Sequence, residues 1–297
     1  MRAGERGAIA SAVTKLEALR QGAPELLQAM QPHLGHALVA GFTGPPGAGK
    51  STLVNALIRH LRSLGKTVAV IAVDPSSPVS GGAILGDRIR MTAALDDDGV
   101  FVRSLASRGY LGGLSPAAVR IIDAFDASGF DVILLETVGT GQNEIDVAEV
   151  ADVRVVIAAP GLGDDIQAMK SGLLEIADVL VVNKGDRDGA EQTMHQLKGA
   201  LSIRALRRHD VPVLKTTATT GAGIEDLMNA VSAVSARVTA LPPVERRRRR
   251  ARYLISRAAA DLVAARIKES NALDHFADQV LAGTLAPDEA AKRLLQG

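Results

Sequence analysis

The chain has 297 residues, of which 47% are hydrophobic, so it is long enough and apolar enough to bury one large core. Its formal charge of +1 gives no global field toward nucleic acid or an anionic membrane, and an aromatic content of 2% leaves few stacking platforms for single-stranded nucleic acid. Without cysteine there are no disulfides, no thiolate zinc site and no cysteine nucleophile, which fits a reducing compartment.

The amino-terminal segment predicts a helical extension rather than a targeting sequence. Its first residues, MRAGERGAIA, lack the apolar core of a signal peptide, and no apolar run reaches the roughly 18 residues of a membrane helix. We therefore expect a soluble protein of the cytoplasm. Residues 1–35 read as this extension because Ile9, Val13, Leu16 and Leu19 recur at near-helical spacing before the breaker-rich sequence QGAP.

Short apolar runs alternate with helical patterns through residues 36–240. This alternation is typical of βαβ units and predicts an α/β fold of the P-loop NTPase type, with a mostly parallel, doubly wound sheet of about seven strands. Most of the runs are continuous and β-branched, as strands covered on both faces are. Their carboxyl ends should form one rim, where ligands of open parallel sheets bind. The predicted strands are residues 36–43, 66–74, 100–105, 131–137, 152–159, 178–184 and 212–218.

The sequence GPPGAGKST at residues 44–52 matches the phosphate-binding pattern G-x-x-x-x-G-K-S/T and lies between a predicted strand and the helix LVNALIRHL. Glycines let successive N–H groups turn toward the phosphates; Lys50 is expected to reach the β- and γ-phosphates, and the Ser51 hydroxyl to ligate Mg²⁺. The alternative is a chance match in a glycine-rich turn. The predicted nucleotide-binding residues of this loop are Gly44, Pro45, Pro46, Gly47, Ala48, Gly49, Lys50, Ser51 and Thr52.

The sequence NKGD at residues 183–186 predicts that the base is guanine. A carboxylate at Asp186 can accept from both the ring N–H and the exocyclic amine of guanine, whereas adenine presents a different edge. A plain turn aspartate is the alternative. The predicted base-binding residues are Asn183, Lys184 and Asp186, with the turn of Thr217, Ala218 and Thr219 covering the base through its backbone N–H groups.

Three acidic residues at or near strand ends are candidates for binding Mg²⁺ beside Ser51, directly or through water. They are Asp74, Asp87 in GGAILGDRIRM, and Glu136, which ends the apolar strand DVILLET. Mg²⁺ keeps several waters, so one or two carboxylates suffice, directly or through water. Asp74 as a helix N-cap and Asp87 as a solvated loop charge are the alternatives.

The segment ETVGTGQNE is similar to the switch region of GTPases, with Glu136 where many have aspartate. Nucleotide hydrolysis needs an in-line water and charge neutralisation rather than covalent chemistry. The predicted catalytic residues are therefore Lys50, Glu136, Gly139 and Gln142. No general base and no arginine finger can be picked out, so slow intrinsic turnover is expected.

Beyond residue 240 the sequence LPPVE breaks the chain, and residues 241–297 predict a helical tail. Ile255, Ala258, Leu262 and Ala265 fall on one face of its first helix. The run Arg246–Arg250 reads as a solvated, flexible helix start. The alternative is a grip on nucleic acid, which a local charge without interleaved aromatic residues does not favour.

Six segments in this order and spacing, GPPGAGKST, VDPSSP, GGAILGDRIRM, ETVGTGQNE, GDDIQAMKSG and NKGD, resemble the MeaB/ArgK family of GTPases associated with methylmalonyl-CoA mutase. The resemblance covers essentially the whole chain. It implies a GTP- and GDP-binding chaperone that loads adenosylcobalamin into an acyl-CoA mutase and protects that enzyme, and a homodimer joined through the helical tails. By position, Lys50, Asp74, Asp87 and Glu136 match the phosphate and metal residues of the family.

The resemblance further implies that GDDIQAMKSG is an extra loop whose Asp164, Gln167 and Lys170 link nucleotide state to the partner. Three other functions stay open: a nucleotide-dependent kinase of amino-acid transport, a nickel-delivering GTPase and a nucleic-acid-binding GTPase. The kinase would need ATP selectivity, against which NKGD argues. Nickel delivery usually shows a His-rich tract or a Cys motif, and this chain has six dispersed histidines and no cysteine.

Overall fold

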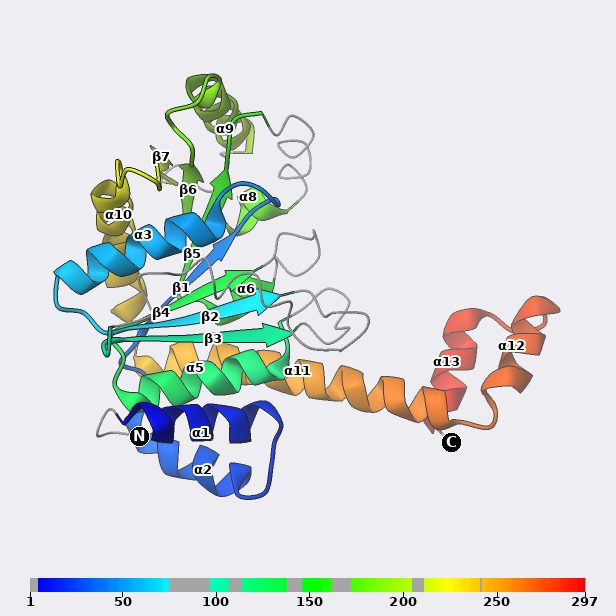
Figure 1. The fold of residues 1–297 in the computed structure, drawn as a ribbon. Coiled ribbons are helices and arrows are strands. Elements are labelled where there is room, and N and C mark those ends of the chain that lie inside the picture. Colours follow the sequence, from blue (N-terminus) through cyan, green and yellow to red (C-terminus); the bar gives the residue numbers. More distant parts are fainter. Residues whose placement is uncertain are drawn as a thin grey trace. The chain divides into compact units, whose positions relative to one another are not determined.

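The computed structural model describes residues 5–74, 97–106, 114–137, 146–161, 172–204, 211–240 and 242–296. The chain divides into two compact units, Met1–Arg250 and Ala251–Gly297. The first unit is built on a seven-stranded sheet in the order β3-β2-β4-β1-β5-β6-β7, in which every neighbouring pair is parallel (Figure 1). The strands are β1 (Leu38–Thr43), β2 (Val68–Asp74), β3 (Val100–Ala106), β4 (Val132–Thr137), β5 (Val153–Ala158), β6 (Val179–Val182) and β7 (Val213–Lys215).

Helices cover both faces of this sheet, so the predicted doubly wound α/β fold is confirmed. α3 and α10 pack on one face, where Phe42 and Leu57 are buried, and α5, α6, α8 and α9 lie on the other. Such strands bury side chains on both faces, which is why their sequences are continuously apolar. These helices are α3 (Lys50–Ser63), α5 (Pro116–Ser128), α6 (Asp146–Val150), α8 (Leu173–Ile176), α9 (Ala190–Arg204) and α10 (Ile224–Thr239).

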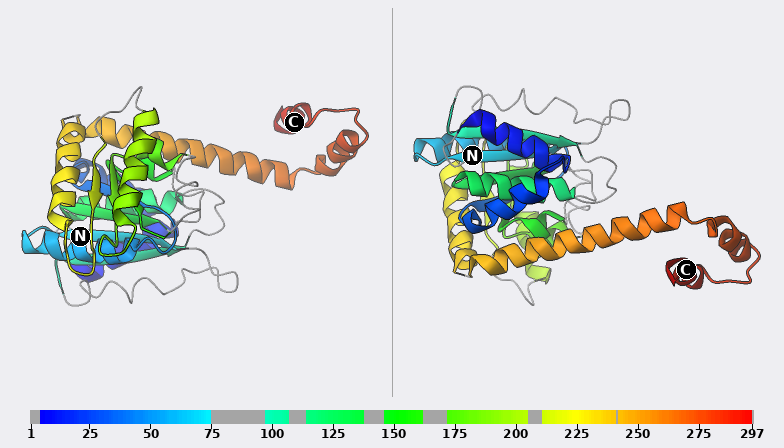
Figure 2. Two further views of the ribbon diagram at one scale, coloured as in Figure 1. Left: turned by 90° about the horizontal axis from the view of Figure 1, so that it is seen from above. Right: turned by 90° about the horizontal axis from the view of Figure 1, so that it is seen from below.

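The amino-terminal extension forms α1 (Arg6–Glu17), α2 (Ala23–Met30) and the short 3-10 helix η1 (Gln31–His33), which pack on the outer side of α5 (Figure 2). Ile9, Val13 and Leu16 are buried, as their helical spacing predicts. Leu19 was expected on the same face and is instead 57% exposed. It lies beyond the end of α1 with a φ of +46°, so the helical period no longer sets its direction.

A buried carboxylate ties the extension to the nucleotide domain. Asp126 on α5 accepts hydrogen bonds from the backbone N–H groups of Gly35, His36 and Ala37, at 2.6, 3.0 and 2.8 Å. These residues join η1 to β1, and an irregular segment of this kind has no ladder to satisfy its N–H groups. One side chain therefore replaces the missing secondary-structure partners.

Replacing Asp126 with alanine is expected to lower the free energy of unfolding by about 2–5 kcal/mol, because several buried N–H groups would lose their acceptor together. Urea denaturation of the full chain measures this. Asp126→Asn retains one acceptor oxygen and should recover part of the loss, while Asp98→Asn, at an exposed position, should match the parent. Equal midpoints for Asp126→Ala and the parent would contradict the assignment.

The second unit contains the rest of α11 (Pro243–Glu269), which begins in the first unit, together with α12 (Leu273–Leu281) and α13 (Pro287–Gln296). On α11, Ile255 and Leu262 are 69% and 72% exposed, so the predicted apolar face is uncovered in this single chain. Among the helices that the structure describes, none combines the length and apolarity needed to cross a membrane.

The arginine run at the start of α11 differs from its prediction. Arg246 and Arg250 are buried, and both bond to Asp152. The interpretation of Arg246–Arg250 as a solvated, flexible helix start is therefore wrong for these two side chains. It failed because their partner lies about a hundred positions away in the sequence, where a local charge pattern gives no sign of it.

Candidate nucleotide site

The loop between β1 and α3 has the backbone that a phosphate cradle requires. Gly44 has a φ of +145°, and a Cβ there would lie 2.1 Å from the carbonyl oxygen of Ile157 on β5. Gly49 has a φ of +87°, and a Cβ there would lie 2.5 Å from Asn183 Nδ2. A Cβ at Gly44 would clash with backbone, and a Cβ at Gly49 would displace Asn183 and have a strained φ, so glycine lets the loop approach β5 and the 183–186 loop closely.

Lys50 begins α3 and is buried within this loop. Its Nζ donates to the carbonyl oxygens of Gly44 and Pro45, at 2.8 and 2.9 Å. The ammonium therefore lies over the loop at the amino-terminal end of a 14-residue helix, where the helix carries partial positive charge. Ammonium, loop N–H groups and helix end together form an electropositive site for phosphate.

Ser51 and Glu136 meet beside the loop. The Ser51 hydroxyl donates to Glu136 Oε1 at 2.6 Å, and Glu136 is buried at the end of β4. One residue further along, the Thr137 hydroxyl donates to the Thr43 hydroxyl at 3.2 Å, which links the ends of β4 and β1. The predicted neighbours Ser51 and Glu136 are thus brought together, with strand ends fixed beneath them.

Asn183 connects three segments that are far apart in the sequence. Its Nδ2 donates to the carbonyl oxygens of Ala48 and Gly49, at 3.0 and 3.3 Å, and its Oδ1 accepts from Thr216 Oγ1 and the N–H of Ala218, both at 3.2 Å. The side chain is fully buried in these bonds. Asn183 therefore holds the phosphate loop and the 217–219 turn in one arrangement, and its contact with a base stays a prediction.

Lys184 and Asp186 lie on the solvent side of the same loop. Lys184 has a φ of +56°, which is unusual for a residue with a side chain, and its Nζ donates to the carbonyl oxygen of Gly47 at 2.6 Å. The N–H of Gly185 donates to the carbonyl oxygen of Thr216 at 2.9 Å. Asp186 is exposed, so its carboxylate is accessible to a base.

The 217–219 turn is held by its own bonds. The N–H of Thr217 donates to the carbonyl oxygen of Ala222 at 2.9 Å, and the N–H of Ala218 donates to Asn183. These two N–H groups maintain the turn, and Thr219 is exposed at its tip. Contact between this turn and a base stays a prediction.

The family described as "Methylmalonyl Co-A mutase-associated GTPase MeaB" matches residues 9–272. The chain belongs to the MeaB family of GTPases. A relative from Pyrococcus horikoshii is 42% identical over all of this chain and 95% of its own length. The GTPase ArgK of Escherichia coli is 41% identical over 78% of this chain and 72% of its own. The crystal structure of a LAO/AO transport system kinase matches with a TM-score of 0.78 and 30% identity, over 99% of this chain and 94% of its own.

A member of the MeaB family is a P-loop GTPase, so this chain binds guanine nucleotide and hydrolyses GTP. Its described residues unite the phosphate loop, Glu136, the 183–186 loop and the 217–219 turn at the carboxyl rim of the sheet, where parallel sheets bind ligands. Asp74 ends β2 there, and its side chain is outside the described part. The other predicted site residues outside the described ranges are Asp87, Gly139, Gln142, Asp164, Gln167 and Lys170.

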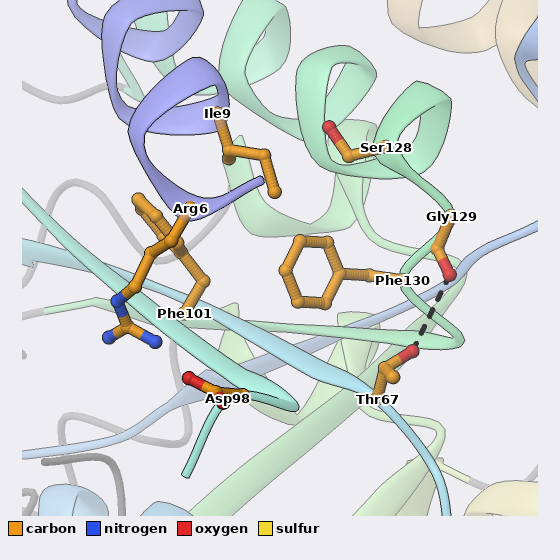
Figure 3. Close-up of a pocket in the computed structure, with 8 residues that line it drawn as sticks. All are labelled: Arg6, Ile9, Thr67, Asp98, Phe101, Ser128, Gly129 and Phe130. Atoms are coloured by element: carbon orange, nitrogen blue, oxygen red, sulfur yellow. Dashed lines mark hydrogen bonds between the residues drawn. The ribbon is translucent and has the colours of Figure 1, made fainter. Parts of the chain in front are cut away.

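A pocket of about 90 Å³ lies elsewhere in this MeaB-family chain and is not the nucleotide site. It is lined by Arg6, Phe101 and Phe130, with Asp98 and Thr67 at the amino ends of β3 and β2 (Figure 3). The Arg6 guanidinium lies 5.4 Å from the centre of the Phe101 ring. The amino edge of the sheet, where this pocket lies, is opposite to the edge that carries the phosphate loop.

Proposed function

We propose that this MeaB-family GTPase is a chaperone for an adenosylcobalamin-dependent acyl-CoA mutase of the methylmalonyl-CoA mutase type. In this role it would assist cofactor loading and protect the mutase, with GTP hydrolysis as the switch. The observation that carries the proposal is the family match over residues 9–272, because that family is described by its association with methylmalonyl-CoA mutase. The GDDIQAMKSG segment supports it by resemblance.

The site supports hydrolysis by positioning and charge rather than by covalent chemistry. Lys50 is already oriented toward the loop by Gly44 and Pro45, and on nucleotide binding its ammonium would hold the β- and γ-phosphates. Asp186 would select guanine by accepting hydrogen bonds from the ring N–H and the exocyclic amine of the base. Gly139 and Gln142 are proposed to place the attacking water.

The oxygen atoms at the Ser51–Glu136 pair fit Mg²⁺. A hydroxyl and a carboxylate lie 2.6 Å apart beside the phosphate loop, and hard oxygen donors of this kind are what Mg²⁺ prefers. Ser51 and Glu136 would hold the ion, and Asp74 and Asp87 are proposed as further ligands, directly or through water. When bound, Mg²⁺ neutralises charge on the phosphate oxygens.

The tail is proposed to join two copies of the chain in a cytoplasmic homodimer. Ile255 and Leu262 expose large apolar side chains on α11, and Leu281 is exposed on α12. Large apolar side chains that are exposed in one copy would be covered if a second copy packed against this segment. The resemblance implies dimerisation through the same helical tail.

The mutase role predicts coupling between the two proteins. A coupling free energy of ~1–3 kcal/mol is typical, so a cognate mutase should alter GTP turnover or affinity by roughly 5- to 150-fold. Replacing both Gln167 and Lys170 with alanine should remove much of that effect and leave GTP affinity nearly intact. The measurement is GTP turnover with and without candidate adenosylcobalamin-dependent mutases.

The double variant Gln192→Ala/Lys198→Ala is a matched control, since both side chains are exposed on α9. It should respond to the mutase as the parent does. Reciprocity requires that nucleotide state also change mutase affinity. Intact intrinsic turnover with no response to any mutase would leave a GTPase that serves another client.

A further inference from the structure

The first turns of α11 carry three arginines on one face. Arg246, Arg249 and Arg250 are spaced i, i+3 and i+4, and such residues are neighbours on a helix surface. Their common partner is Asp152, in the turn between α6 and β5, whose side chain is 0% exposed. We refer to these four residues as the arginine latch; all of them belong to the first compact unit.

The Asp152 carboxylate joins α11 to the strand of the phosphate loop. Its Oδ2 accepts from Arg250 Nη2 at 3.1 Å, from Arg246 Nη1 at 3.4 Å and from the N–H of Val39 on β1 at 3.0 Å. Arg249 Nη2 lies 3.7 Å from Oδ1. A buried carboxylate with this set of donors is held firmly, because removing a partner leaves an uncompensated buried charge.

The same guanidinium groups cap the carboxyl end of α6. Arg250 Nε donates to the carbonyl oxygen of Val150 at 2.9 Å, and Arg249 Nη2 donates to that of Ala151 at 2.6 Å. The last carbonyls of a helix lack partners within the helix and carry partial negative charge, so cations are stabilising there. α11 is therefore held to α6 by two hydrogen bonds and by the attraction of its arginines to the carboxyl end of α6.

α6 in turn rests directly on β1. A Cβ at Gly41 would lie 2.2 Å from Val147 Cγ1 and 2.9 Å from Ala151 Cβ, so glycine allows this close packing. Gly41 is three positions before Gly44 of the phosphate loop. The N–H of Asp152 also donates to the carbonyl oxygen of Val39 at 2.7 Å. Contacts thus run without a break from the phosphate-loop strand through α6 to α11.

Burial and neighbouring charges shift the pKa values of two side chains at the latch. Burial lowers the pKa of Arg249, Asp152 opposes that shift, and Arg154 and Arg250 reinforce it. On α5, burial raises the pKa of Asp123 to about 6, and Arg250 opposes the rise. The pKa of Asp123 thus also depends on the arginines of α11. The electrostatic energy of such closely spaced buried charges changes strongly when any of the side chains moves by a small distance.

We propose that the arginine latch transmits nucleotide state from β1 and α6 to α11. A shift of α6 on β1 would move the carbonyls of Val150 and Ala151, which are direct partners of α11, and this helix continues to Glu269 in the second unit. In this proposal the latch would take two arrangements, one for each nucleotide state, as such coupling requires. The proposal requires that the chain binds guanine nucleotide, but it does not require a mutase partner. The latch proposal and the mutase role can therefore fail separately.

The test is amide hydrogen exchange of the full chain without nucleotide, with GDP and with a non-hydrolysable GTP analogue. In the parent, exchange of the amides at 246–256 should differ by roughly 5- to 150-fold between the GDP and analogue states. Arg249→Gln should remove most of this difference and retain nucleotide affinity. It is the milder variant, because the Arg249 side chain is 33% exposed whereas that of Arg250 is 5% exposed.

Arg248→Gln is the matched control. This exposed arginine bonds to Glu245 in its own helix, and its variant should keep the difference shown by the parent. The proposal is overturned if the parent shows no nucleotide-dependent exchange at 246–256. It is also overturned if Arg249→Gln keeps the full difference, or if Arg248→Gln loses it equally. The parent measurement decides even if a latch variant fails to fold.

Discussion

Lys50→Ala is expected to lower GTP turnover by about 100- to 1,000-fold, the typical cost of removing one preorganised charge or donor from a transition state. The ammonium is buried at the start of α3 and held by Gly44 and Pro45, so no other side chain of the loop can replace it. GTP binding should weaken as well, since Lys50 is proposed to contact the same phosphates in the ground state. Steady-state phosphate release by the purified variant measures this effect.

Lys66→Ala is a suitable control, because Lys66 is exposed and pairs with Asp131 at the opposite edge of the sheet. Its turnover should equal that of the parent. If Lys50→Ala released phosphate as fast as the parent, the assignment of residues 44–52 as the phosphate loop would be wrong.

Asp186→Asn is expected to lower the affinity for GTP by about 10- to 150-fold, since a hydrogen bond to a charged group contributes about 1.5–3 kcal/mol. The amide would present a donor where guanine also presents one. Xanthine carries an oxygen at that position, so the variant should gain affinity for xanthosine triphosphate. Titration calorimetry of the parent and the variant, with GTP and with xanthosine triphosphate, measures this change in nucleotide affinity.

Asp188→Asn provides the matched comparison, because Asp188 is also exposed and lies two positions away. It should leave the preference for GTP unchanged. In the parent, GTP and GDP should bind at least about tenfold tighter than ATP and ADP, a difference of about 1.4 kcal/mol. Equal affinity for ATP and GTP would contradict the role of Asp186.

The sheet could be predicted from sequence because its strands are covered on both faces and therefore read as uninterrupted apolar runs. Among the carboxyl ends of the strands, the predictions for β6 and β7 differ most from the structure. The predicted strand 178–184 stops at Val182, and the predicted strand 212–218 consists of Val213–Lys215. Beyond these points Asn183 bonds across loops and Lys184 takes a positive φ, so side-chain bonds rather than a ladder fix the backbone.

The parts of the site that consist of consecutive residues with a characteristic motif, the phosphate loop and the 183–186 loop, could be predicted from the sequence. The pairing of Ser51 with Glu136 also followed, because both lie at the carboxyl rim. The hydrogen bonds of Asn183 to other loops and the burial of Arg246 and Arg250 could not be predicted from the sequence. Each depends on a partner many positions away, and neither the type of a residue nor its local spacing specifies such a partner.

The bonds of Asn183 have a consequence for folding. The Nδ2 bond to Ala48 joins residues separated by 135 positions, so the base- and phosphate-binding loops meet only when β1, β5 and β6 have paired in the sheet. Because the site needs both loops together, we expect GTP to bind the native state much more tightly than the unfolded chain. A nucleotide concentration 100 times the Kd would then stabilise the fold by about 2.7 kcal/mol. The cellular supply of guanine nucleotide thus acts on how long this protein persists as well as on what it does.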